Sequence, residues 1–268
     1  MAFVIAEIGV NHGGNVREAV RLIGVAARVG ADAVKFQAYN PELLDPPGSM
    51  RDMIRPLCLS HGDLEGLKIS AEAYGIEFMA TPFDPDTLEW LVGLGVKRLK
   101  ISSGGLRDEY LLKAASTSGL PIILSTGMAR HGDIWCALRT LKWAGNVTLL
   151  QCTSTYPCPP EDVNLRAMET LRREFGCQVG LSDHTTSIAI PAAAVALGAT
   201  VIEKHLTASR DQVGPDHKAS LEPNEFASMV EGIREVEKAM GDGIKCPQES
   251  EAPVMAVRGD REAWRCAS

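Results

Sequence analysis

The sequence predicts a single (β/α)₈ barrel of the α/β class. Short apolar runs alternate with amphipathic segments along the first 240 residues, and eight such pairs can be counted. At roughly 30 residues, each pair has the size of one strand and one helix. Eight units within about 250 residues are typical of a closed barrel, whereas open doubly wound sheets usually have fewer strands. Neither GxGxxG nor GxxxxGK[ST] occurs, so the common nucleotide-binding loops of open sheets are absent.

The predicted strands are short apolar runs bounded by polar or glycine-containing segments. Most of them end in polar residues, which places polar side chains at one end of a parallel barrel. The expected ranges are 3–8, 33–36, 77–80, 98–102, 121–124, 147–151, 178–181 and 200–203.

The first predicted helix shows how the helices are identified. Asn15 offers an N-cap, Glu18 follows in the spacing of a capping box, and Gly30 provides a C-terminal stop. The last helix, 223–240, begins near Pro223 and has the clearest apolar stripe, formed by Phe226, Met229, Val230, Ile233, Val236 and Met240. The remaining helices are expected at 60–74, 85–94, 109–118, 131–144, 163–175 and 186–197.

Two segments do not fit the repeat. Residues 40–56 contain four prolines and follow the second strand, so we expect a long loop over the barrel mouth. We expect the barrel to occupy residues 1–243, and residues 244–268 to form a linker-like tail without regular structure.

Composition excludes several other classes of protein. The chain has 268 residues, 45% hydrophobic and 23% charged, and its 27 basic against 34 acidic residues give a net charge of −7. This charge opposes an extended nucleic-acid surface. Residues 185–202 are uncharged but contain Pro191 and Gly198, so no membrane span is predicted. Seven cysteines without a CxxC pair or a secretory signal predict reduced thiols in the cytoplasm.

Polar residues at the C-terminal strand ends matter most, because the chemistry of such barrels is placed there. Lys35 and Lys100 lie in otherwise apolar strands, and burying an unpaired ammonium is costly. One interpretation pairs them with an internal carboxylate, such as Glu7 or Glu203. The other is an anion pocket in which both ammoniums and several hydroxyls surround one phosphate. The hydroxyls belong to Ser103, Ser125, Ser154 and Ser182.

His184 and His205 end consecutive strands, so we expect their imidazoles to be neighbours. Two histidines with waters and substrate oxygens suit Mn²⁺, Mg²⁺ or another divalent ion; a hydrogen-bonded histidine pair is the alternative. Cys152 carries no signature of a catalytic cysteine and is interpreted as a structural thiol. Asp216 lies on a Gly/Pro turn after the last strand, from which it can face a substrate.

Nine motifs occur in the order typical of one enzyme family and span nearly the whole barrel. They are IAEIGVNHGG at 5–14, AVKFQ at 33–37, TPFD at 81–84, KISSG at 100–104, PIILSTGM at 121–128, CTSTYPCPPEDVNL at 152–165, GLSDHT at 180–185, IEKHLT at 202–207 and GPDHKASLEP at 214–223. With these motifs the chain resembles the sialic acid synthase family, the phosphoenolpyruvate-dependent N-acetylneuraminate synthases and their relatives.

The resemblance implies a TIM-barrel enzyme that condenses phosphoenolpyruvate with an N-acetylhexosamine-type aldose, releasing phosphate by C–O cleavage. It assigns phosphoenolpyruvate binding to Lys35, Lys100, Ser103, Ser125, Ser154 and Ser182. It makes His184 and His205 ligands of a divalent metal, first Mn²⁺, with Mg²⁺ or Co²⁺ as alternatives. Sugar contacts fall to Gln37, Tyr156 and Asp216, and the catalytic residues to Glu7, His184 and His205. A cytoplasmic homodimer is expected.

The chain departs from the family pattern in two ways. Gly105 stands where relatives carry a carboxylate that faces the reacting centre, so a candidate acid or base is missing. The family's C-terminal antifreeze-like domain, which offers an arginine to the sugar, is not seen in this sequence. Two alternatives therefore stay open. The same chemistry acts on a different aldehyde in a specialised pathway, or the barrel binds phosphoenolpyruvate without catalysis.

Overall fold

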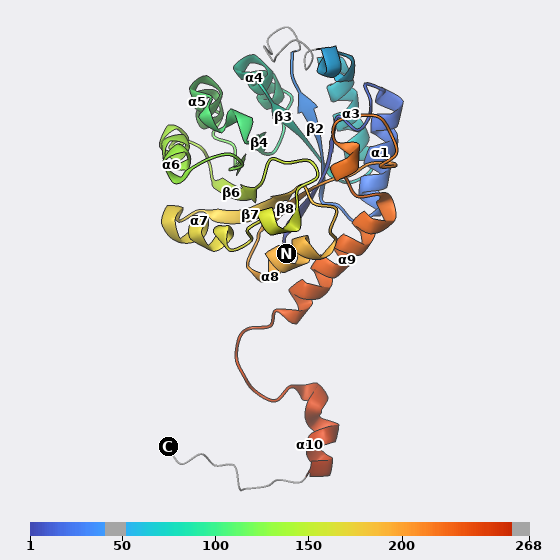
Figure 1. The fold of residues 1–268 in the computed structure, drawn as a ribbon, viewed down its shortest axis with the longest axis vertical. Helices are drawn as coiled ribbons and strands as arrows, with labels where there is room; N and C mark the ends of the chain where they lie inside the picture. The colour runs from blue at the N-terminus through green and yellow to red at the C-terminus, as the bar shows by residue number, and fades with distance from the viewer. Residues whose placement is uncertain (41–51, 259–268) are drawn as a thin grey trace.

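A computed structural model describes residues 1–40 and 52–258, and it confirms a nearly closed, eight-stranded parallel barrel (Figure 1). The hydrogen-bonded strand order is β3-β2-β1-β8-β7-β6-β5-β4. The strands are β1 (Phe3–Gly9), β2 (Ala33–Ala38), β3 (Glu77–Pro82), β4 (Leu99–Ile101), β5 (Ile122–Ser125), β6 (Val147–Cys152), β7 (Gln178–Asp183) and β8 (Val201–His205).

Helices follow the strands around the outside of the barrel (Figure 1). They are α1 (Val16–Arg28), α3 (His61–Ala73), α4 (Pro85–Gly93), α5 (Glu109–Thr117), α6 (His131–Thr140), α7 (Ala167–Phe175), α8 (Ala189–Ala196) and α9 (Pro223–Ala239). A further helix, α10 (Ala252–Arg258), belongs to the C-terminal tail. Short 3₁₀ turns lie at Arg55–Leu57, Gly104–Arg107, Pro160–Asp162, His217–Ala219 and Glu249–Glu251.

Local sequence signals explain where the helices begin and end. The Asn15 side chain accepts hydrogen bonds from the backbone N–H groups of Arg17 and Glu18, as an N-cap does, and Gly30 follows α1 with φ of +82°. The Glu18 carboxylate binds Arg21 instead of closing a capping box. The predicted N-cap and stop are therefore confirmed, but the reciprocal half of the box is not.

The apolar stripe of α9 packs against the barrel as predicted, except at its end. Phe226, Met229, Val230 and Ile233 are buried, and Val236 is partly buried. Met240 is exposed because it lies beyond the last helical residue, Ala239. These side chains join one continuous apolar layer between strands and helices, which supplies most of the buried apolar surface.

The barrel is least regular between β3 and β4. Within the described residues these two strands are neighbours in space but share no hydrogen-bonded ladder. At the N-terminal end of this seam, Arg98 makes two hydrogen bonds to the Glu77 carboxylate, at 2.7 and 3.1 Å. This bidentate ion pair joins the strands where backbone pairing does not.

The barrel interior is built in layers, because successive residues of a strand point alternately inward and outward. The lowest layer is apolar and consists of Ile5, Ala33, Met79, Ile123, Leu150 and Val201. Two residues further along the same strands, the inward side chains become polar or charged, as at Glu7, Lys35 and Ser125. The apolar layer thus closes the barrel below a polar chamber that opens at the C-terminal strand ends.

The two irregular segments differ in how the structure treats them. Part of the predicted 40–56 loop lies outside the described residues. Its last residue, Pro56, is described, and the Pro56 carbonyl lies close to Gly14, after β1. The tail was expected to lack regular structure, and this is wrong for residues 249–258, which form a 3₁₀ turn and α10 away from the barrel (Figure 1). Among the described helices none is long and apolar enough to cross a membrane.

Candidate active site at the C-terminal strand ends

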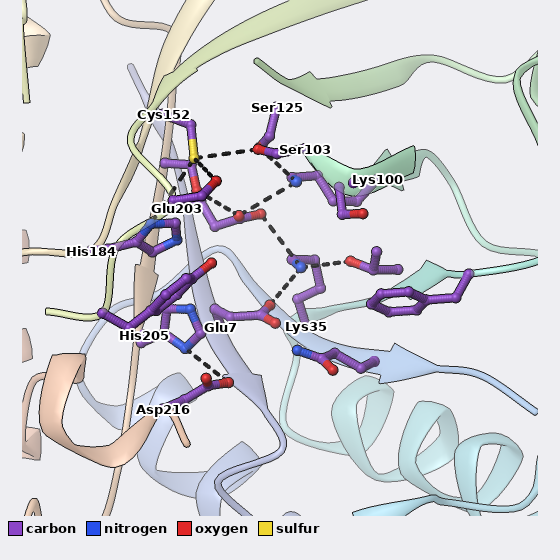
Figure 2. A pocket seen from close by; sticks show the side chains of 18 of the residues that line it. Glu7, Lys35, Lys100, Ser103, Ser125, Cys152, His184, Glu203, His205 and Asp216 are labelled. Atoms are coloured by element: carbon purple, nitrogen blue, oxygen red, sulfur yellow. Dashed lines mark hydrogen bonds and ion pairs between the residues drawn. The ribbon is translucent and has the colours of Figure 1, made fainter. Parts of the chain in front are cut away.

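A cavity of about 510 Å³ opens at the C-terminal ends of the strands. All twelve side chains predicted for the site line it: Glu7, Lys35, Gln37, Lys100, Ser103, Ser125, Ser154, Tyr156, Ser182, His184, His205 and Asp216. Figure 2 labels ten of the lining residues, whose side chains converge from segments that are far apart in the sequence. The inward positions of the parallel strands bring them together.

Both predicted lysines are buried and paired with carboxylates (Figure 2). Nζ of Lys35 lies 2.7 Å from Oε2 of Glu7 and 3.6 Å from Oε2 of Glu203. Nζ of Lys100 lies 3.6 Å from Oε1 of Glu203 and donates a hydrogen bond of 2.8 Å to Oγ of Ser125. Carboxylate pairing and an anion pocket were the two interpretations of these lysines. They are compatible, because the paired ammoniums also face the cavity.

The two carboxylates have opposite protonation preferences. Burial raises the pKa of Glu7 to about 7, and the opposing effect of Lys35 does not cancel it. Burial would also raise the pKa of Glu203, but Lys100 and Lys35 together outweigh it and hold that pKa below its ordinary value. Because the two pKa values are shifted in opposite directions, Glu203 is ionised near neutral pH while Glu7 can still carry a proton.

The serine side chains form a compact hydroxyl cluster around the lysines. Ser182 donates a hydrogen bond of 3.0 Å to Glu203, and Ser103 accepts one of 3.0 Å from the backbone N–H of Gly127. A Cβ atom at Gly127 would lie 2.3 Å from Oγ of Ser154 and 2.7 Å from Oγ of Ser103. Only glycine therefore lets the STGM turn approach the hydroxyls so closely.

Cys152 lies within this hydroxyl cluster. Its Sγ accepts a hydrogen bond of 3.5 Å from Oγ of Ser103 and lies 4.0 Å from Nδ1 of His184. The thiol is buried and lines the cavity beside the serines. The six cysteines within the described residues are all free.

The two histidines are neighbours, as predicted, with ring centroids 5.5 Å apart. Nδ1 of His184 lies 2.8 Å from the Thr153 carbonyl oxygen, to which it donates a hydrogen bond, so its Nε2 is left for another partner. Burial lowers the pKa of His205 well below its ordinary value, which keeps this imidazole neutral. The ring of Tyr156 packs on His184 at 4.1 Å between centroids.

The donors around the histidines fit a divalent cation. Nδ1 of His205 and Oδ2 of Asp216 are buried 3.8 Å apart, and neither has a hydrogen-bond partner in the part of the chain that the structure describes. Neutral imidazoles with an unused nitrogen are preferred ligands of transition-metal ions. Residues 1–40 and 52–258 contain no group of three or more His, Cys, Asp or Glu arranged as a complete metal site. Two histidine ligands would leave the other positions to water and substrate.

Sequence reasoning undervalued three residues of the cavity. Glu203, considered only as a partner for a lysine, lies between both ammoniums. Thr81 accepts a hydrogen bond of 2.7 Å from Lys35, and Phe83 lines the wall. The signal for Glu203 was its position two residues before His205, on the same strand face. Within the TPFD motif, Thr81 lies near the C-terminal end of β3 and Phe83 directly follows the strand, at the same end of the barrel.

The expectation for Gly105 was wrong in its geometry. A side chain there was expected to face the reacting centre, but Gly105 does not line the cavity, whereas Gly104 does. A Cβ atom at Gly105 would lie 3.0 Å from Cδ2 of Leu111 and 3.1 Å from Cγ2 of Ile101. The position points into the apolar contact between β4 and α5, because a 3₁₀ turn at Gly104–Arg107 rotates it away.

Comparison with known proteins agrees with this geometry. A family model described as the NeuB family matches residues 22–245. The N,N'-diacetyllegionaminic acid synthase of Legionella pneumophila is 42% identical over 276 aligned positions, which cover 95% of this chain and 78% of that protein. The N-acetylneuraminate-9-phosphate synthase of Homo sapiens is 38% identical over 259 positions, covering 91% and 72%.

Solved structures give the same result. The crystal structure of the N-acetylneuraminic acid (sialic acid) synthetase of Leptospira borgpetersenii, in complex with citrate, superimposes with a TM-score of 0.90 at 39% identity. The match covers 98% of this chain and 93% of that one. The fold is therefore shared over nearly the whole chain.

Proposed function

The chain belongs to the NeuB family, and from this premise we propose that it condenses phosphoenolpyruvate with an N-acetylhexosamine-type aldose to give a nonulosonic 2-keto acid and inorganic phosphate. C3 of phosphoenolpyruvate bonds to the aldehyde carbon, water adds at C2, and the C2–O bond breaks as phosphate leaves. The observation that carries the proposal is the buried cluster of two ammoniums and two carboxylates beside paired histidines.

The ammoniums and hydroxyls bind the anionic substrate. Lys35 and Lys100 supply the positive charge, and Ser103, Ser125 and Ser182 supply donors suited to phosphate oxygens. Because these groups are held by buried strands, they need no rearrangement when charge moves onto the departing phosphate. Ionised Glu203 holds both ammoniums in position.

Glu7 provides the proton. Its pKa of about 7 suits general acid and base work at neutral pH. The side chain lies 2.7 Å from Lys35, beside the anion pocket, and its strand neighbour on β8 is His205. It donates its proton to the oxygen that was the aldehyde oxygen of the acceptor.

His184 and His205 would hold a divalent cation, for which Mn²⁺ is the first choice. When bound, the cation supplies Lewis-acid polarisation of the aldehyde. The exposed residue Tyr156, with Gln37 and Asp216, contacts the sugar, because all three line the same cavity as the anion pocket.

The test is phosphate release from phosphoenolpyruvate labelled with ¹⁸O at the bridging position, with Mn²⁺ and a panel of aldoses. We expect aldose-dependent release in which the label appears in phosphate, because the C–O bond breaks. Chelator and the double variant His184→Ala/His205→Ala should both abolish release. Label-free phosphate, or no release with any acceptor, would contradict the proposal.

A homodimer and a cytoplasmic location are also proposed. The free thiols in the described part of the chain support a reducing compartment. The homodimer follows from the resemblance, and light scattering after gel filtration tests it directly.

A further inference from the structure

A second ion pair lies directly behind the site, on the outer face of the barrel. Nζ of Lys204 is 2.6 Å from Oδ2 of Asp183, and both side chains are 0% exposed. The two residues are register neighbours on β7 and β8. Neither lines the cavity, so the pair does not belong to the substrate-binding groups.

The Lys204 ammonium also binds the loop that follows β7. It donates hydrogen bonds to the carbonyl oxygens of Thr185, at 2.5 Å, and Ser187, at 3.2 Å. Oδ1 of Asp183 accepts one of 2.9 Å from the backbone N–H of Thr185. The Ser187 hydroxyl in turn accepts from the N–H of Ala189, where α8 begins. One ammonium thus ties β8 to the whole β7–α8 turn.

The residues of this network are direct sequence neighbours of the two histidines. His184 lies between Asp183 and Thr185, both of which bind Lys204, and His205 follows Lys204 directly. Consecutive residues of an extended chain point to opposite faces. The ion pair therefore lies on the outer face of the barrel, and the histidine that follows each of its members lines the cavity. Any change in the separation of Asp183 and Lys204 moves the histidines as well.

Stability alone does not account for the pair. The outward residues one step earlier on these strands, Leu181 and Ile202, are apolar and fully packed. Well-packed apolar residues in place of a buried ion pair are often as stable or more stable, because the ions must be desolvated. Unlike an apolar pair, the ion pair and its hydrogen bonds are directional, so they fix the distance between the two strand ends.

We propose that Lys204 and Asp183 are positioning residues that set the separation of His184 and His205, and thereby the affinity of the site for a divalent cation. The inference rests on the proposed function, because it takes the two histidines as the cation's ligands.

The experiment compares Mn²⁺ binding to the parent and to Lys204→Met/Asp183→Asn, using the electron paramagnetic resonance signal of free Mn²⁺. The double variant leaves no buried charge unpaired, and the amide oxygen keeps the hydrogen bond from Thr185. We expect about 10–100-fold weaker Mn²⁺ binding, as for other groups that orient metal ligands. Phosphoenolpyruvate affinity in chelator should stay unchanged, because Lys35 and Lys100 are untouched.

The matched control is Arg98→Met/Glu77→Gln, which removes a cross-strand ion pair at the opposite end of the barrel. It should lower the melting temperature without changing Mn²⁺ affinity. An equal loss of Mn²⁺ affinity in this control would overturn the inference, since general loosening would then explain both.

The remaining outcomes are also decisive. If the parent itself binds no Mn²⁺, the proposed metal site fails, and the positioning role fails with it. If the parent binds and a folded Lys204→Met/Asp183→Asn variant binds equally well, only the positioning role is wrong. Should that variant not fold, the isosteric single variant Asp183→Asn replaces it, because it removes the ion pair while Lys204 keeps its hydrogen bonds to the carbonyl oxygens of Thr185 and Ser187. Unchanged Mn²⁺ affinity there overturns the inference.

Discussion

Lys100 is a buried cation, and its side-chain partners Ser125 and Glu203 both line the proposed anion pocket. Replacing it in Lys100→Met removes a charge-assisted contact worth about 1.5–3 kcal/mol, so phosphoenolpyruvate affinity should fall by roughly 10–150-fold. Calorimetric titration without aldose measures this directly. Lys113→Met, which removes an exposed ammonium paired with Glu109, is the control and should bind like the parent. Unchanged affinity in Lys100→Met would remove the lysine from the pocket.

Gly105 illustrates how one side-chain direction changes a functional prediction. A glutamate there begins against Leu111 and Ile101, in an apolar contact. We expect Gly105→Glu to lose about 1–3 kcal/mol of stability by overpacking, with no gain in kcat. Thermal melts and steady-state kinetics measure the two effects. Gly104→Ala is the control for the melt, because a Cβ there meets only Oγ of Ser102 at 3.8 Å. A higher kcat at an unchanged melting temperature would show that position 105 reaches the reacting centre.

His12 makes acid destabilise the fold. Its ring is buried near Phe36, and burial lowers its pKa from 6.5 to about 4. The neutral ring is therefore favoured in the folded state, and its contribution is fully present above pH 6.5 and lost as the pH falls through 4. Between pH 7 and 4 the parent should lose about 3 kcal/mol more unfolding free energy than His12→Gln. Urea titrations at both pH values test this, and equal losses would contradict it.

At the scale of elements, the seam between β3 and β4 depends on side chains. Arg98 holds Glu77 with two hydrogen bonds and lies 4.2 Å from the centroid of the Phe3 ring. Arg98→Ala should therefore cost about 1–2 kcal/mol of unfolding free energy. Arg21→Ala, which breaks a surface pair with Glu18 inside α1, should cost less than about 1 kcal/mol. If denaturant titrations give the same loss of unfolding free energy for Arg98→Ala and Arg21→Ala, the Arg98–Glu77 ion pair is not needed to join β3 and β4.

For the whole molecule, the layered interior separates stability from binding. Leu150 belongs to the apolar floor, one layer below the charged cluster. Leu150→Ala should cost about 2–5 kcal/mol of unfolding free energy through the cavity it leaves. Phosphoenolpyruvate affinity at a temperature well below the melt should match the parent, because the lysines and serines lie above the floor. A parallel loss of affinity would show that the layers are coupled.

The sequence determined the barrel and the membership of its site. Eight apolar runs of strand length, alternating with amphipathic helices, predict a (β/α)₈ barrel. Its parallel strands bring their C-terminal ends to one face of the barrel. The two-residue period of a strand then decides which side chains point inward. This is why Glu7, Lys35, Lys100, Ser125 and His205, from distant parts of the chain, were predicted together and lie together.

Only the tertiary structure decided how these groups share charge and direction. The opposite pKa shifts of Glu7 and Glu203 depend on distances to two ammoniums from other strands, which no local pattern contains. The direction of Gly105 depends on a 3₁₀ turn packed against α5, and the Lys204–Asp183 pair on strand register. Periodicity sets the face on which a residue lies. Desolvation and pairing act over a few ångströms between elements, so they are fixed only when the barrel closes.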